Sequence, residues 1–196
     1  MKKKSVKAQS EQIEQAVKAL QQGGVIAYPT EAVYGLGCDP LNESAIKKIL
    51  KLKQRDKEKG LILIAANFEQ VKPFLQDLNK DIEEKILLSW SESTKPITWL
   101  IPVKNSTSSF LSGQFDTLAV RVTKHPVVKE LCEKFNSAIV STSANLSKQE
   151  PARNSQQVFQ FFENEVDFIV EGETDLNAQP SEIRDVLTNK IIRPAN

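Results

Sequence analysis

The chain reads GGVIAYPTEAVYGLG from residue 23 to residue 37, and this stretch sets the expected architecture. Gly23 and Gly24 end a predicted helix over residues 9–22, whose apolar positions recur at helical spacing. Residues 25–28 then form a short apolar run, which predicts a buried strand that ends at Pro29. A helix, a tight stop and a buried strand in succession favour an α/β protein.

Predicted helices and strands continue to alternate along the rest of the chain. The unbroken apolar run at 61–64 is typical of a strand buried on both faces. Pro126, after His125, suits the first turn of a helix. Further helices are predicted from Asn42 or Glu43 to 52, over 67–78 with Asn67 as cap, and over 81–90 and 155–163. Further strands are predicted at 97–103, 117–122, 138–140, 167–170, 182–187 and 190–193. We expect one α/β domain over 1–196 with a mixed parallel and antiparallel sheet, and residues 1–8 as a flexible extension.

Composition excludes several classes of protein. Lys plus Arg number 26 and Asp plus Glu 25, so bulk charge carries no nucleic-acid or membrane signature. No apolar run approaches the roughly 20 residues that a membrane-spanning helix needs. Cys38 and Cys132 lie far apart without CxxC or Cys/His spacing. A disulfide framework or zinc site is therefore not expected, and a reducing cytoplasm fits the cysteine usage.

Two segments rich in polar groups directly follow predicted strands. In residues 28–37, Thr30 offers a hydroxyl, while Gly35 and Gly37 let the backbone approach a ligand closely. Residues 141–147 read STSANLS, whose hydroxyls and amide can hold phosphate oxygens or a zwitterion. The alternatives are an ordinary turn for the first segment and a capped helix start for the second. Both alternatives stay open on spacing alone.

Cations mark two more places. Every odd position from Lys51 to Lys59 is basic, so an extended segment would place five cations on one face and favour an anion there. A helical segment would instead spread them as a solvated charge run. Arg121 lies in the otherwise apolar strand 118–122 and points either to solvent or into a pocket. His125, the only histidine, is predicted simply to shape a helix start.

Common catalytic motifs are missing from the sequence. There is no GxxxxGK[ST] phosphate loop and no complete GxGxxG. One histidine and two unremarkable cysteines do not support a nucleophile triad. Any chemistry should therefore depend on positioning and charge stabilisation rather than on a covalent nucleophile.

Together these segments resemble the YrdC/Sua5/TsaC family. Residues 28–37 look like its PTE loop, Lys53-Gln54-Arg55 matches its KxR motif, and Ser143-Ala144-Asn145 matches its SxN motif. Stretches 59–64, 118–122 and 180–185 are similar to the short bacterial TsaC branch, and the resemblance runs from about residue 12 to Arg193. Asp56 departs from a usual proline, and residues 90–98 depart from Trp-Pro-Gly-Pro-(Val/Ile)-Thr. The additional C-terminal domain of the longer Sua5 branch is not among these residues.

The resemblance implies a curved sheet around a large, basic, open cavity. It implies an L-threonylcarbamoyladenylate synthase, a nucleotidyltransferase that uses L-threonine, bicarbonate and ATP with Mg²⁺ and releases pyrophosphate. The product would serve the t6A modification of tRNAs that read ANN codons, through a t6A transferase complex. No organic cofactor and no protein ligand for the metal are expected. Whether tRNA binds this chain directly is left open.

Residue roles follow from the same resemblance. Lys53 and Arg55 would hold the phosphates and act catalytically, and Thr30, Arg121 and Ser143 would bind threonine. The nucleotide would contact Lys53, Arg55, Lys59, Thr98, Ser141, Asn145, Ser181 and Arg193. A non-catalytic RNA- or tRNA-binding module is the main alternative, although no aromatic residues are interleaved for base stacking. A carbamoyltransferase accessory domain is a second alternative, but such domains are fused to zinc-finger modules that this sequence lacks.

Overall fold

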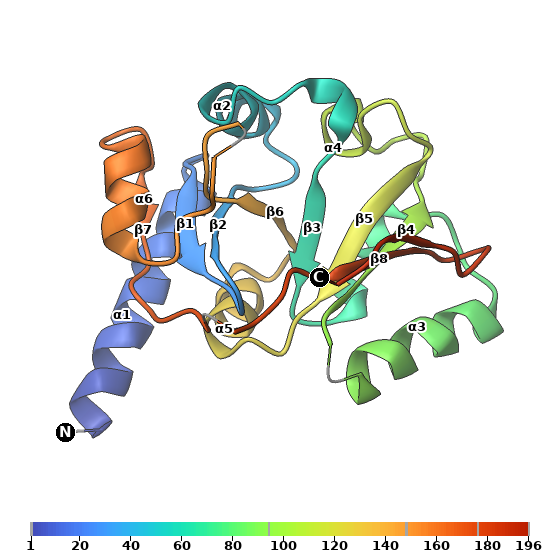
Figure 1. Cartoon of the computed structure of the whole chain (residues 1–196), viewed down its shortest axis with the longest axis horizontal. Helices are drawn as coiled ribbons and strands as arrows, with labels where there is room; N and C mark the ends of the chain where they lie inside the picture. The colour runs from blue at the N-terminus through green and yellow to red at the C-terminus, as the bar shows by residue number, and fades with distance from the viewer. Residues whose placement is uncertain (1, 94, 148, 176, 196) are drawn as a thin grey trace.

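The computed structural model describes residues 2–93, 95–147, 149–175 and 177–195, with side chains from residue 7 onward. Within these residues a mixed sheet runs through the molecule with helices against it (Figure 1). The strands are β1 (Ile26–Pro29), β2 (Tyr34–Gly37), β3 (Ile62–Ala65), β4 (Ile97–Pro102), β5 (Thr117–Val122), β6 (Ile139–Ser143), β7 (Phe168–Ile169), β8 (Glu182–Asp185) and β9 (Ile191–Arg193). The helices are α1 (Lys2–Gln21), α2 (Glu43–Leu52), α3 (Lys80–Glu92), α4 (Ser109–Ser112), α5 (Pro126–Phe135) and α6 (Ser155–Phe162).

The strand order is β7-β1-β2-β6-β3-β5-β4-β8-β9. The pairs β1–β7, β3–β5 and β4–β8 are parallel, and the other neighbouring pairs are antiparallel. The expected α/β fold with a mixed sheet is therefore confirmed. This order places β6, with its hydroxyl-bearing end, between β2 and β3 near the centre of the sheet.

Two hydrophobic cores lie on opposite faces of the sheet. On β3, Leu63 and Ala65 join the core that includes α2, α3 and α6, whereas Ile64 joins the core formed with α1 and α5. Ile26 and Tyr28 of β1 also face α1 and α5. Because successive side chains of a strand point to opposite faces, burial on both sides requires the continuous apolar run that predicted β3.

Local chemistry fixes the ends of the helices. The Asn42 side chain accepts a hydrogen bond from Ala45 N at 3.0 Å and caps α2. His125 occupies the N-cap of α5 and Pro126 its first turn, which confirms that this pair shapes a helix start. The predicted helix at 9–22 begins earlier, at Lys2, because no glycine or proline interrupts the segment before it. Residues 2–8, expected in a flexible extension, are thus part of α1.

Three further predicted elements differ from the structure. Residues 34–37, predicted as part of a loop, form β2, which pairs with β1 as a hairpin. Residues 141–143, predicted as a loop, continue β6. The predicted helix over 67–78 is replaced by the 3-10 turns Phe68–Gln70 and Lys72–Phe74. Asn67 does cap the first of them, but Pro73 has no amide hydrogen to continue an α-helix.

The central hairpin depends on Gly37. A Cβ atom at this position would lie 2.6 Å from Val140 O and 2.8 Å from Tyr28 Cε1. Gly37→Ala is expected to lower the free energy of unfolding by about 3 kcal/mol, because neither a central-strand carbonyl nor a fully buried ring can move aside freely. Urea denaturation measures this change.

Gly35→Ala is the matched control, since the three atoms nearest to its Cβ would be Cζ, Cε2 and Oη of Tyr28, at 3.2–3.4 Å. It should cost clearly less stability than Gly37→Ala. Equal costs would contradict the role assigned to the Val140 carbonyl.

Candidate active site

A cavity of about 360 Å³ opens where the β1–β2 turn, the end of β6 and residues 179–181 meet. We call it the arginine cavity because guanidinium groups from three distant parts of the chain line it. Seven of the predicted site residues belong to its lining: Thr30, Arg55, Arg121, Ser141, Ser143, Ser181 and Arg193. The sheet pairs Gly35 with Ser143 and Ile62 with Ser141, and this register brings the hydroxyls of β6 beside the turn that carries Thr30.

Arg55 is held by backbone oxygens. Its Nη2 donates to Gly60 O at 2.9 Å and its Nε to the same oxygen at 3.2 Å. Burial lowers the pKa of the guanidinium, although it stays charged. Asp56 has φ −59°, a value that proline also adopts, and its carboxylate accepts from Glu58 N at 3.0 Å. This departure from the family pattern thus keeps a fixed turn after Arg55.

Lys53 lies behind the cavity wall rather than in it. The side chain is buried, and its ammonium donates to Ser143 O, to Asn145 O at 2.9 Å and to Asn145 Oδ1 at 2.9 Å. Burial, and then the charge of Arg55, lower the pKa of Lys53 to about 8. The ammonium remains protonated at neutral pH, and its three hydrogen bonds tie the end of α2 to the SxN segment.

The Asn145 side chain, like that of Lys53, has its polar atoms in hydrogen bonds within the protein. Its Oδ1 accepts from Ser143 Oγ at 2.6 Å, and its Nδ2 donates to Leu146 O and Gln149 O. Lys53, Ser143 and Asn145 therefore form one hydrogen-bonded unit, of which Ser143 faces the arginine cavity.

The far wall of the arginine cavity comes from the last strands. Arg193 Nη2 donates to Ser181 O at 2.8 Å. Ser181 Oγ lies 2.8 Å from Thr98 Oγ1, in a pair that is buried. Thr98 supports Ser181 from behind and does not line the cavity itself. Thr94, in the divergent segment before it, lies outside the described residues.

Two predicted ligand-binding residues, Thr30 and Lys59, are less available to a ligand in the arginine cavity. Thr30 lines the cavity, but its hydroxyl donates to Val33 O at 2.7 Å, which leaves only its lone pairs for a ligand. Lys59 is exposed and lies outside the lining; its backbone oxygen accepts from Arg55 Nη2 at 3.4 Å. The segment 51–59 is not extended: it consists of the end of α2, a turn and the 3-10 helix Lys57–Lys59.

Arg121 makes an ion pair with Glu31, and both residues line the cavity. Only 13% of the Arg121 side chain and 29% of the Glu31 side chain are exposed. Burial acts to raise the pKa of Glu31, but the charge and hydrogen bond of Arg121 outweigh it, so this pKa lies below its usual value. Arg121 thus points into a pocket, which settles the alternative that the sequence left open.

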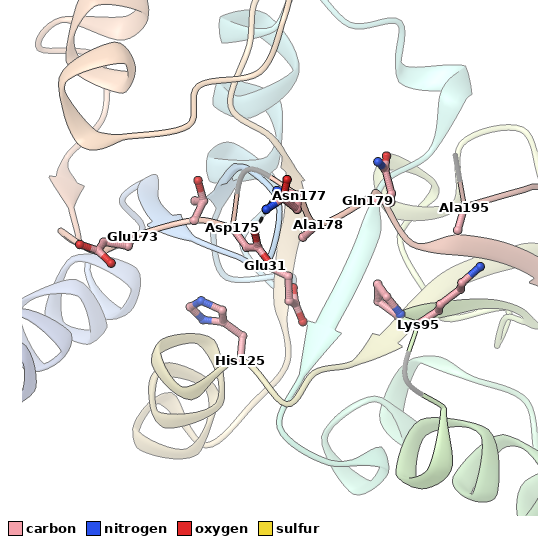
Figure 2. Close-up of a pocket in the computed structure, with 11 residues that line it drawn as sticks. Glu31, Lys95, His125, Glu173, Asp175, Asn177, Ala178, Gln179 and Ala195 are labelled. Atoms are coloured by element: carbon pink, nitrogen blue, oxygen red, sulfur yellow. Dashed lines mark hydrogen bonds between the residues drawn. The ribbon is translucent and has the colours of Figure 1, made fainter.

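A larger cavity of about 710 Å³ adjoins the first at Glu31. Figure 2 shows Glu31 between His125, at the start of α5, and Lys95, in the loop before β4. Glu173 and Asp175 also line this larger cavity. Positive charge is therefore concentrated in the smaller arginine cavity, and a large basic cavity stays a prediction.

Sequence reasoning missed Glu31, Thr123 and His125 as members of the site. Glu31 stood inside the PTE loop, and Thr123 and His125 directly follow β5, where strand ends commonly meet ligands. Their places in the PTE loop and after the end of a strand were the sequence signals that could have identified these three residues. His125 makes no side-chain capping bond and lines the larger cavity instead.

The described ranges contain no group of three or more His, Cys, Asp or Glu side chains that could hold a metal ion. None of the helices in the same ranges has an apolar stretch long enough to cross a bilayer. Both cysteines are buried, and burial raises the pKa of each thiol.

Comparison with known proteins gives consistent matches. Residues 18–195 match the Sua5/yciO/yrdC family model, described as "Telomere recombination". The threonylcarbamoyl-AMP synthase of Enterobacter sp. (strain 638) is 52% identical over 183 residues, which cover 92% of this chain and 94% of that protein. The threonylcarbamoyl-AMP synthase of Vibrio campbellii is 47% identical, with 92% and 97% covered.

Solved structures agree with this result. Sua5 of P. abyssi in complex with L-threonine has a TM-score of 0.83 and 30% identity over 93% of this chain. The match covers 54% of the Sua5 chain, so this protein spans about half the length of that relative. E. coli YciO, at 22% identity and a TM-score of 0.75, shares the fold. The chain belongs to the Sua5/YciO/YrdC family.

Proposed function

We propose that this protein is an enzyme that makes threonylcarbamoyl-AMP from L-threonine, bicarbonate and MgATP. The observation that carries the proposal is the convergence of Arg55, Arg121 and Arg193 with serine hydroxyls on one cavity. These groups match the carboxylate, carbamate and phosphates of the substrates. Relatives at 47–52% identity that carry the name of this activity support it.

The reaction needs binding and charge stabilisation more than protein nucleophiles. The amine of threonine and bicarbonate form a carbamate and water, and a carbamate oxygen attacks the α-phosphate of ATP. The bond from that phosphorus to the α,β-bridging oxygen breaks, and pyrophosphate leaves with the electron pair. Cations fixed beforehand stabilise the leaving charge without reorganisation. The buried thiols, whose pKa values are raised, are not suited to attack.

Residue roles follow from position around the arginine cavity. Arg121 pairs with the carboxylate of threonine, and Thr30 and Ser143 accept or donate the remaining hydrogen bonds of the amino acid. Arg55 and Arg193 bind the phosphates, Ser141 and Ser181 contact the nucleotide, and Thr98 supports Ser181. Lys53 and Asn145 hold Ser143 in place, because the Lys53 ammonium is already bound to Ser143 and Asn145. Lys59, exposed beside Arg55, meets the outer phosphates.

Mg²⁺ enters as part of MgATP, on the phosphates and water. We propose that the product passes to a t6A transferase complex acting on tRNA, and hence that the protein acts in the cytoplasm. Direct binding of tRNA is a separate property, which the assay below measures independently.

Pyrophosphate release from MgATP is expected to require both L-threonine and bicarbonate. The purified protein is assayed with each omitted in turn, and threonylcarbamoyl-AMP is identified by mass spectrometry. Release that does not depend on threonine, combined with salt-dependent tRNA binding, would contradict the enzyme and favour an RNA-binding module.

A further inference from the structure

Glu31 occupies the point where three cavities meet. It lines the arginine cavity, the larger cavity, and a third cavity of about 320 Å³ that also contains Arg121 and Thr123. It is carried by the turn between β1 and β2, and its backbone oxygen accepts from Asp175 N at 2.8 Å. A ligand that spans these cavities would therefore pass this carboxylate.

A chain of hydrogen bonds fixes the carboxylate from behind. Thr123 Oγ1 donates to Glu31 Oε1 at 2.9 Å and accepts from His125 N at 3.0 Å. Thr123 is itself buried, and its amide donates to Ala65 O at 3.0 Å. The end of β5 and the start of α5 therefore hold Glu31 in one position, and Glu31 holds Arg121 through the ion pair.

This network leaves hydrogen-bonding capacity unused. In the described part of the chain, Arg121 Nε and Glu31 Oε2 are buried without a hydrogen-bond partner. Free positions on a buried guanidinium and on the carboxylate paired with it are costly unless a ligand or an ordered water satisfies them. A zwitterion, with its own carboxylate and ammonium, offers the complementary groups.

We propose that Glu31 is a positioning residue that orients Arg121 for the carboxylate of the amino-acid substrate, and that Thr123 fixes Glu31 in turn. This inference rests on the proposed function and adds residues to it. Arg–carboxylate recognition depends on the plane of the guanidinium fork, so an Arg121 free to rotate would bind the substrate more weakly.

A different role for Glu31 makes the opposite prediction. If Glu31 only competed with the substrate for Arg121, removal of its charge would free Arg121 and tighten threonine binding. Under the positioning role, the same removal loosens Arg121 and weakens binding. Glu31→Gln therefore separates the two by the direction of the change.

The experiment compares steady-state kinetics of threonine-dependent pyrophosphate release. Glu31→Gln is expected to raise the KM for threonine at least about tenfold, with kcat changed less and the KM for ATP close to the wild-type value. Thr123→Val, which removes only a hydroxyl, should raise the same KM several-fold, and Thr123→Ser should restore most of it. The double variant should lose no more than Glu31→Gln alone, because both act through Arg121.

Glu173→Gln is the matched control, a neutralised carboxylate that lines only the larger cavity. Its KM for threonine should equal that of the wild type. If Glu31→Gln does not fold, as judged by thermal unfolding, Thr123→Val carries the test with all charges intact.

Each outcome decides between the proposals. Wild-type turnover with an unchanged or lower KM in Glu31→Gln overturns the positioning role and leaves the proposed function standing. Wild-type protein without threonine-dependent turnover and without threonine binding by calorimetry overturns both. A raised KM in Glu31→Gln and Thr123→Val, with Thr123→Ser close to wild type, supports the inference.

Discussion

Arg55→Ala is expected to lower the rate of threonine-dependent pyrophosphate release by at least about a hundredfold. The guanidinium lines the arginine cavity, and Gly60 O fixes it through two hydrogen bonds. It is therefore oriented before the nucleotide arrives, and a water molecule cannot replace its charge as pyrophosphate leaves. Single-turnover rates at saturating ATP separate this loss from weaker binding.

Two further variants test whether charge or geometry matters at Arg55. Arg55→Lys keeps the charge but not the two-pronged fork, so its rate should lie between those of wild type and Arg55→Ala. Lys57→Ala removes an exposed cation of the same segment, outside the cavity, and should leave the rate unchanged. If Lys57→Ala reduced the rate as strongly as Arg55→Ala, general positive charge rather than Arg55 would explain the effect.

Lys53→Met is expected to reduce turnover by at least about tenfold and to lower the free energy of unfolding by about 1–3 kcal/mol. Methionine fills most of the buried volume but leaves Ser143 O, Asn145 O and Asn145 Oδ1 without their common donor. The SxN segment then loses its link to α2, and Ser143 loses its position in the cavity wall. Kinetics and urea denaturation measure the two effects.

Asn145→Ala provides the comparison for Lys53→Met. It removes the side-chain acceptor but leaves the two backbone acceptors of Lys53 in place. Because the Asn145 side chain also bonds Ser143, Leu146 and Gln149, Asn145→Ala should lower stability as well. If the two residues form one unit, the double variant should lose less stability than the sum of the single variants. A fully stable, fully active Lys53→Met variant would contradict the holding role.

Sequence patterns predicted most of the fold because local rules agree with tertiary packing there. The apolar run of β3 is buried on both faces, and Asn42 and Pro126 start helices as their side chains dictate. β2 was missed because Gly35 and Gly37 are typical of turns. Its strand conformation depends on β1 and β6, which lie on either side of it, and close contact with the Tyr28 ring requires those glycines.

The sequence predicted which residues belong to the candidate site better than it predicted which residues they contact. Arg55, Arg121 and Ser143 belong to three distant segments of the chain and line one cavity, as the family resemblance implies. Spacing alone could not reveal that Glu31 pairs with Arg121, since 90 positions separate them and the pairing needs the β1–β2 hairpin, β6, β3 and β5 to be assembled in one sheet. Their roles in catalysis remain predictions for the experiments above.

The parallel pairing of β1 with β7 has a consequence for folding during synthesis of the protein. Ile26 of β1 lies opposite Phe168 of β7, so this edge of the sheet closes only after most of the chain has been translated. Arg193, which completes the arginine cavity, is made later still. A nascent chain on the ribosome therefore carries Glu31 and Arg121 before it can enclose a substrate. The early strands therefore keep unpaired edges until the later strands are made, which exposes them to non-native pairing during synthesis.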